Sequence, residues 1–225
     1  MRALIAGATI AALAGIAAAD VANFDSETEG FKGASFTSGG ITFFGVNSVA
    51  GLNPDGSNFV PGEYGTDLIV ERAITLFNDF PSVVSSPNVL GFGSAFVPGD
   101  NLSINIFSTV SMTTGSVQNA ASLDLLYFEN GPWGSIDIHF DALLGGSVVG
   151  SDGLTISDLG GRDNLTSVHL SIDGVNFDEL RLYAQFGNGT NTVIAGIVDN
   201  VSITPAPGTA ALLALGGLVS VRRRR

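Results

Sequence analysis

The sequence predicts an all-β protein, an antiparallel β-sandwich of the jelly-roll type, between Asp20 and Thr204. Short stretches of alternating apolar and polar residues recur through this region, and no useful length of it has helical periodicity. Glycine, of which the chain has 30, separates these stretches together with Pro, Asn and Asp. About ten such strands at regular spacing are typical of a sandwich. No linker interrupts them, so we expect one domain.

The first half of this region supplies five expected strands. Leu68–Phe77 is ambiguous between strand and helix, but its β-branched residues and proline-rich sequel favour a strand. The other strands are expected at Val21–Asp25, Ile41–Val46, Val89–Phe92 and Leu102–Ile106. The Asn53–Asn58 segment contains Pro and Gly at turn positions, which indicates a loop.

The second half is expected to begin with a hairpin. Leu123–Glu129 and Ser135–Leu143 flank a five-residue loop that contains Gly, Pro and Trp. Three further alternating strands follow, around Val168–Ile172, Leu180–Phe186 and Val193–Ile203. Pro205 ends the last one, because proline cannot donate a ladder hydrogen bond.

Charge and cysteine content exclude several classes of function. The chain has no cysteine, which rules out disulfides, thiolate metal sites and a cysteine nucleophile. All 21 acidic residues lie between Asp20 and Asp199, where only four of the nine basic residues accompany them. Such a surface repels phosphate backbones, so we expect no nucleic-acid partner.

Both ends of the chain differ from this acidic region. Residues 1–19 combine one arginine, an apolar stretch and a final Ala-Ala-Ala, which predicts a helical secretory signal peptide and a mature start at Asp20. Residues 205–225 contain an apolar run of 14 residues before four arginines. As a helix this run would reach ~21 Å, short of the ~30 Å bilayer core. We expect it to be a transient membrane anchor.

The order of proline motif, short apolar helix and arginine cluster resembles a PEP-CTERM sorting domain. Pro205 and Pro207 match the two prolines of that motif, and Ala206 stands where the usual motif has glutamate. The basic cluster consists of Arg222, Arg223, Arg224 and Arg225. The resemblance implies an exported bacterial protein processed by an exosortase-like enzyme. A plain C-terminal membrane anchor is the alternative.

No enzymatic activity is expected. The segment from Gly134 to Phe140 resembles the catalytic strand of laminarinase-like glycoside hydrolases, but only Asp137 matches a catalytic carboxylate. Ser135 and His139 replace the two glutamates, whereas a retaining glycosidase needs a pair of carboxyl groups. We expect Asp137, His139 and Asp141 on the solvent face of a strand. No G-x-S-x-G elbow is present either.

A structural calcium ion is the expected cofactor. Asp199 shares the alternation parity of Ile197, Val201 and Ile203, and a core-facing carboxylate is costly unless it is paired or metal-bound. Asp25 and Glu27 would meet it if the first and last strands are neighbours. Sandwich modules of the carbohydrate-binding type resemble this arrangement, and oxygen ligands suit Ca²⁺. Alternatively, Asp199 lies at a rim and contacts water or a backbone N–H.

Aromatic residues supply the expected ligand site. Trp133, Tyr183 and Tyr127, with Arg181 nearby, are candidates for a sugar-stacking platform; ordinary core packing is the alternative. The expected function is an exported cell-envelope or extracellular-matrix protein with a structural or adhesive sandwich. The alternative is a lectin-like module that binds polysaccharide.

Overall fold

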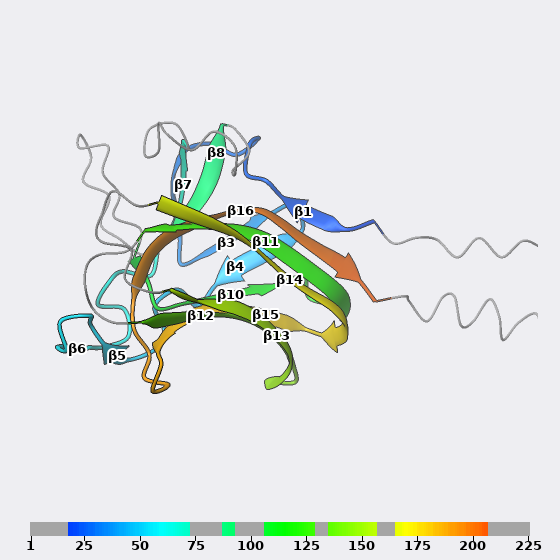
Figure 1. The fold of residues 1–225 in the computed structure, drawn as a ribbon. Helices are drawn as coiled ribbons and strands as arrows, with labels where there is room; N and C mark the ends of the chain where they lie inside the picture. Colours follow the sequence, from blue (N-terminus) through cyan, green and yellow to red (C-terminus); the bar gives the residue numbers. More distant parts are fainter. Residues whose placement is uncertain (1–17, 73–86, 93–105, 129–134, 157–164, 207–225) are drawn as a thin grey trace, which may run out of the picture.

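The chain forms two antiparallel sheets that pack face to face, which confirms the predicted β-sandwich (Figure 1). The computed structural model describes residues 18–72, 87–92, 106–128, 135–156 and 165–206. Most of the expected signal peptide (1–17) and of the expected sorting tail (207–225) lie outside these residues, as does Trp133. Most of the 102–106 strand and residues 73–77 of another expected strand also lie outside them. Within the described ranges, no helix has the length and apolar content needed to cross a membrane.

The larger sheet, sheet A, has eight strands. Its order is β14 (Leu165–Phe177), β11 (Gln118–Phe128), β16 (Ile194–Pro205), β8 (Asn88–Phe92), β7 (Leu68–Arg72) and β2 (Gly30–Gly33), with β1 (Asp20–Ala22) and β9 (Ile106–Phe107) also paired to β16. Because β1 pairs with β16, the first and last strands are neighbours, as the calcium hypothesis required.

The smaller sheet, sheet B, has six strands. Its order is β13 (Ser147–Ile156), β12 (Ile136–Leu144), β15 (Glu179–Phe186), β10 (Thr109–Thr113), β4 (Ile41–Phe44) and β3 (Ser35–Ser38). A separate two-stranded ladder joins β5 (Gly51–Leu52) to β6 (Asn58–Phe59) around the predicted 53–58 turn.

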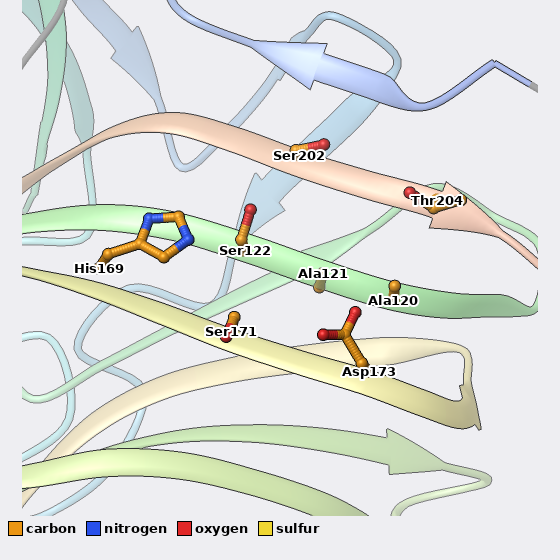
Figure 2. A pocket seen from close by; sticks show the side chains of 8 residues that line it. All are labelled: Ala120, Ala121, Ser122, His169, Ser171, Asp173, Ser202 and Thr204. Carbon is orange, nitrogen blue, oxygen red and sulfur yellow. The ribbon is translucent and has the colours of Figure 1, made fainter.

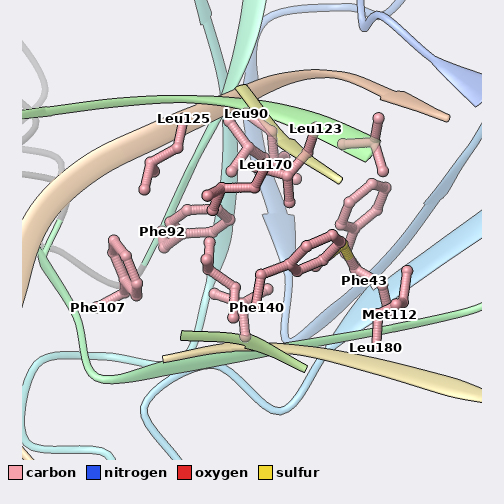
Figure 3. Close-up of a cluster of buried hydrophobic side chains, with 14 of the residues drawn as sticks. Phe43, Leu90, Phe92, Phe107, Met112, Leu123, Leu125, Phe140, Leu170 and Leu180 are labelled. Atoms are coloured by element: carbon pink, nitrogen blue, oxygen red, sulfur yellow. The ribbon is translucent and has the colours of Figure 1, made fainter. Parts of the chain in front are cut away.

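The hydrophobic core lies between the sheets, where inward-facing residues of both layers interdigitate (Figure 3). Phe92 and Phe107 of sheet A meet edge to face, with ring centroids 5.3 Å apart. Leu123 of sheet A and Phe140 of sheet B are fully buried. Alternation therefore leaves every second residue of the long strands on an outer face, and the candidate sites lie there.

The predicted hairpin between the 123–129 and 135–143 strands is wrong. β11 pairs with β14 and β16 in sheet A, whereas β12 pairs with β13 and β15 in sheet B. The two strands therefore belong to different layers and cannot form a hairpin with each other. The hairpin is instead β12–β13, where Gly145 and Gly146 have positive φ angles of 57° and 80°. Such angles are typical of a two-residue hairpin turn.

A β-bulge in β16 corrects the expected orientation of Asp199. The register with β11 shifts between Ser122 and Asp124, and Asn200 has a φ of 49°. The extra residue reverses the alternation, so Asp199 lies opposite Asp124 on the outer face while Val201 belongs to the core. Asp199 is nonetheless fully buried.

A buried asparagine fixes the loop after β4. Asn47 is 2% exposed and has a φ of 53°. Its amide donates to the carbonyl oxygens of Gly65 at 2.9 Å and Ile106 at 3.1 Å, and its oxygen accepts the Ser108 N–H at 2.7 Å. It thereby joins three chain segments with its side-chain donors and acceptor satisfied.

Candidate functional sites on the two outer faces

The outer face of sheet B carries the residues that the sequence analysis assigned to ligand binding. Tyr183 and Arg181 project from β15, beside His139 and Asp141 of β12. Register pairs His139 with Tyr183 and Asp141 with Arg181. The structure therefore places two of the predicted ligand residues, Tyr183 and Arg181, together. It also places beside them His139, which the sequence analysis had assigned only to a polar face.

His139 and Tyr183 form a stacked pair. Their ring centroids are 4.7 Å apart and their planes differ by 13°. The Tyr183 hydroxyl donates a hydrogen bond to Asp141 Oδ2 at 2.8 Å. Burial, and secondly the bond to Asp141, raises the pKa of Tyr183 to about 12. The phenol is therefore a fixed donor at physiological pH, and the ring cannot swing away without breaking this bond.

Asp141 departs from the expected solvent position. It is only 6% exposed, although it belongs to the outer face of β12. Neighbouring Asp137 is half-buried and accepts a hydrogen bond from the Thr155 hydroxyl at 2.6 Å. The two carboxylates flank His139 along the strand, so hydrogen-bond acceptors stand on both sides of the stacked rings.

Arg181 is held by its own strand. Its guanidinium contacts Glu179 Oε1 at 3.1 Å, and the same oxygen accepts the Ser111 hydroxyl at 2.9 Å. The Arg181 side chain is 42% exposed. The contact uses one nitrogen, Nη2, of a guanidinium that carries five N–H donors, so the side chain keeps donors available to a ligand.

Among the described residues, the position across from His139 on β13 carries no side chain. The residue opposite His139 on β13 is Gly153. A Cβ atom there would lie 2.2 Å from the Ile138 carbonyl oxygen, so the close approach of the backbone requires glycine. The row across the sheet is therefore Gly153, His139, Tyr183 and Thr109, with one bare position next to the aromatic pair.

The predicted platform of three aromatic residues does not form as expected. Tyr127 is 3% exposed and belongs to the core on sheet A. It cannot share a surface with Tyr183, which lies on the outer face of sheet B. The parity of β11 explains this, since Leu123, Leu125 and Tyr127 all alternate toward the interior.

The outer face of sheet A has a different character, because an open hollow of about 290 Å³ lies across β14, β11 and β16 (Figure 2). Its side chains are mostly small and polar. Ser122 is opposite Ser171 on one side and Ser202 on the other. Ala120, Ala121, His169, Asp173 and Thr204 complete the lining.

A hydrogen-bonded chain borders this hollow. His169 Nδ1 lies 2.7 Å from Asp124 Oδ1. The Asn200 side-chain amide donates to the other oxygen, Asp124 Oδ2, at 2.9 Å. The Asn200 backbone N–H in turn donates to Asp199 Oδ1 at 2.8 Å. The bulge that reorients Asp199 thus also positions Asn200 to hold Asp124.

The predicted calcium ligands are only partly brought together. Asp25 and Glu27 both lie in the turn after β1, where Asp25 accepts the Asn88 N–H at 3.3 Å and Glu27 accepts the Ser38 hydroxyl at 2.8 Å. Asp199 lies on the bulge of β16. Among the described residues, no group of three or more His, Asp or Glu side chains is arranged to hold a metal ion. The three residues named for calcium therefore do not form a cage by themselves.

No protein-family model matches this sequence, and no curated protein does. Among solved structures, the chain is similar to an arabinose-bound α-L-arabinofuranosidase (16% identity, TM-score 0.33), covering 61% of this chain but only 22% of that enzyme. It is also similar to a family 32 carbohydrate-binding module from C. perfringens in complex with galactose (13% identity, TM-score 0.30), covering 74% of this chain and 98% of that module.

A third similar structure is a family 29 carbohydrate-binding module complexed with mannohexaose. Identity is 12% and the TM-score is 0.30, with 85% of this chain and 94% of that module covered. At TM-scores of this size, these likenesses carry no inference about what this chain binds.

Proposed function

We propose that the sandwich binds polysaccharide through the outer face of sheet B. The observation that carries this proposal is the stacked His139–Tyr183 pair beside the bare Gly153 position. A sugar ring presents an apolar C–H face and a rim of hydroxyls. An aromatic face with hydrogen-bonding groups around it matches both features.

The parts of the site have distinct roles in this proposal. The sugar ring lies over Gly153 and packs against the free side of the His139 imidazole, while Tyr183 supports the imidazole from behind. Asp137 and the Arg181 guanidinium exchange hydrogen bonds with sugar hydroxyls. We propose binding without glycoside hydrolysis on this face, because Ser135 and His139 stand where a pair of catalytic glutamates would be needed.

Binding of the purified full-length chain to a panel of polysaccharides tests this proposal. We expect His139→Ala to weaken binding about two- to tenfold, since loss of aromatic stacking costs ~0.5–1.5 kcal/mol. Phe31→Ala is the matched control, because Phe31 is a 49% exposed aromatic residue on sheet A, away from this face. Unchanged binding in His139→Ala, or no binding to any glycan by the parent chain, would contradict the proposal.

A structural or adhesive role at the cell surface is the second candidate. The pairing of Asp20 with Ile203 favours it, because both ends of the domain leave the sandwich side by side (Figure 1). We propose that a signal peptide directs export and that the Pro205–Pro207 motif directs sorting by an exosortase-like enzyme, with transient anchoring in the membrane. The mass of the mature C-terminus tests this: loss of the four terminal arginines supports processing, and their retention contradicts it.

Calcium remains part of this proposal as a structural cofactor of the turn after β1. Its removal gives a direct test, because a ligand that binds only the folded state raises the melting temperature. We expect EDTA to lower the melting temperature and Ca²⁺ to restore it, with Asp25→Asn abolishing the difference. Identical melting curves with EDTA and with Ca²⁺ would exclude the ion.

A further inference from the structure

Three side chains on the outer face of sheet A have the relative positions of an acyl-transfer site. Asp124 and His169 are directly opposite each other on β11 and β14. Ser122 lies two residues before Asp124 and therefore on the same face. Diagonal neighbours across two strands are ~7–8 Å apart at their Cα atoms, within reach of a histidine side chain.

The orientation of His169 fits the role of a general base. With Nδ1 bonded to Asp124 at 2.7 Å, the imidazole that carries its proton on Nδ1 leaves Nε2 as the acceptor. Figure 2 shows the ring edge that carries this second nitrogen turned toward Ser122, and both residues line the same hollow. Asn200 holds the far oxygen of Asp124 at 2.9 Å, which fixes the carboxylate that orients the imidazole.

An acyl-transfer site must also stabilise the developing oxyanion, and two serines beside Ser122 can do so. Ser171 and Ser202 flank Ser122 on the two neighbouring strands, directly opposite it in register. Hydroxyl groups placed in this way can donate hydrogen bonds to a tetrahedral intermediate formed at Ser122. Within the described part of the chain, Ser122 Oγ makes no hydrogen bond to His169. Catalytic hydrogen bonds often close only when substrate is bound. Figure 2 shows the Ser122 hydroxyl directed toward β16, so the role of nucleophile requires it to rotate about the Cα–Cβ bond toward His169.

We propose that this hollow is an acyl-transfer site that hydrolyses small carboxylic esters. Ser122 Oγ attacks the ester carbonyl carbon while its proton passes to His169 Nε2. The tetrahedral intermediate expels the alcohol, which takes the proton from Nε2 as the ester C–O bond breaks. Water then attacks the acyl-serine with the same proton transfers, releasing the carboxylic acid and restoring the serine hydroxyl.

The lining of the hollow restricts the substrate. Hydroxyls, two alanines and the Asp173 carboxylate surround Ser122, and among the described residues no large apolar side chain lines the hollow. A short acyl group such as acetyl therefore fits better than a long alkyl chain, which would remain in water. Asp173 disfavours an anionic substrate. This activity is independent of the polysaccharide proposal, which concerns the opposite face of the sandwich.

Labelling with a fluorophosphonate and hydrolysis of p-nitrophenyl acetate, both on the purified full-length chain, test the proposal. We expect a covalent adduct on the peptide that contains Ser122, and at least a hundredfold loss of hydrolysis in both Ser122→Ala and His169→Gln. Ser35→Ala changes an exposed strand serine on sheet B and should keep the parent rate. Melting curves confirm that each variant is folded, and the adduct on the parent chain is informative even where a variant is not.

Two results would overturn the proposal. One is the absence of any adduct at Ser122 in the parent chain. The other is hydrolysis that falls in His169→Gln but not in folded Ser122→Ala, because that pattern identifies simple imidazole catalysis by an exposed histidine. A p-nitrophenyl butyrate rate far above the acetate rate would overturn the assignment to short acyl groups.

Discussion

The two outer faces of the sandwich follow the same strand alternation but present opposite surfaces. Sheet B carries a stacked ring pair whose tyrosine is hydrogen-bonded to an almost buried carboxylate. Sheet A carries a hollow floored by serine and alanine, bordered by a histidine that is 62% exposed. Side-chain size at register-matched positions accounts for the difference: rings opposite each other fill one face, whereas three serines in a row leave the other open. Substitutions of outer-face residues should therefore lower the free energy of unfolding more on sheet B than on sheet A.

The largest expected effect is at Gly153, which borders the ring pair. Gly153→Ala places a Cβ atom 2.2 Å from the Ile138 carbonyl oxygen, and we expect unfolding by urea to show a loss of about 2 kcal/mol or more. Gly187→Ala is the matched control, because its nearest atom outside the local chain is Ser135 Oγ at 3.8 Å. Equal stability of the two variants would show that the β12–β13 ladder relaxes around a side chain.

A smaller effect is expected from the hydroxyl of Tyr183. Tyr183→Phe removes the donor to Asp141, which is 6% exposed, and a hydrogen bond to a charged group is worth ~1.5–3 kcal/mol. Because Tyr183 itself is half-buried, we expect about 1 kcal/mol. On sheet A, the equivalent loss of the His169–Asp124 contact in His169→Gln should cost less, ~0–1 kcal/mol, because His169 is exposed. A larger loss of stability in His169→Gln than in Tyr183→Phe would contradict the expected difference between the two faces.

The pH dependence of Tyr183 is expected to be smaller still. The folded-state pKa of Tyr183 is raised to about 12, chiefly by burial, from the ordinary tyrosine value of 10.0. The protonated phenol therefore contributes stability that is complete below pH 10 and is lost as the pH rises through 12. Burial also raises the pKa of Tyr64, so titration of tyrosinate absorbance should be compared between the parent chain and Tyr183→Phe, with a step near pH 12 expected in the parent. Tyr183→Phe should remove that late step, and its persistence would assign the step to another tyrosine.

Much of this fold follows from local sequence pattern. The alternation in Leu180–Phe186 identified β15 with its buried and half-buried faces, and Pro205 was expected at the end of the last strand and lies at the end of β16. The 68–72 part of the ambiguous segment is a strand, as its β-branched residues indicated. These features are local, since the side-chain period of a strand and the backbone limits of proline do not depend on distant residues.

The sequence did not predict which strands pair with each other. A five-residue loop rich in Gly and Pro indicated a hairpin at 130–134, yet β11 and β12 belong to different layers. The β12–β13 turn and the bulge at Asn200 were missed, although positive φ is common at Gly and tolerated at Asn. One extra residue at the bulge was enough to reverse the side on which Asp199 lies.

The sequence by itself determined an acidic, cysteine-free β-sandwich in which strands such as β15 alternate between apolar and polar residues. Only the tertiary structure decided which polar residues meet. His169 and Asp124 are 45 residues apart in the chain, and Tyr183 and Asp141 are 42 apart. Strand alternation fixes the face of a residue, but register and sheet order are set by how all the strands bury their apolar faces together. Both candidate sites are products of that long-range pairing.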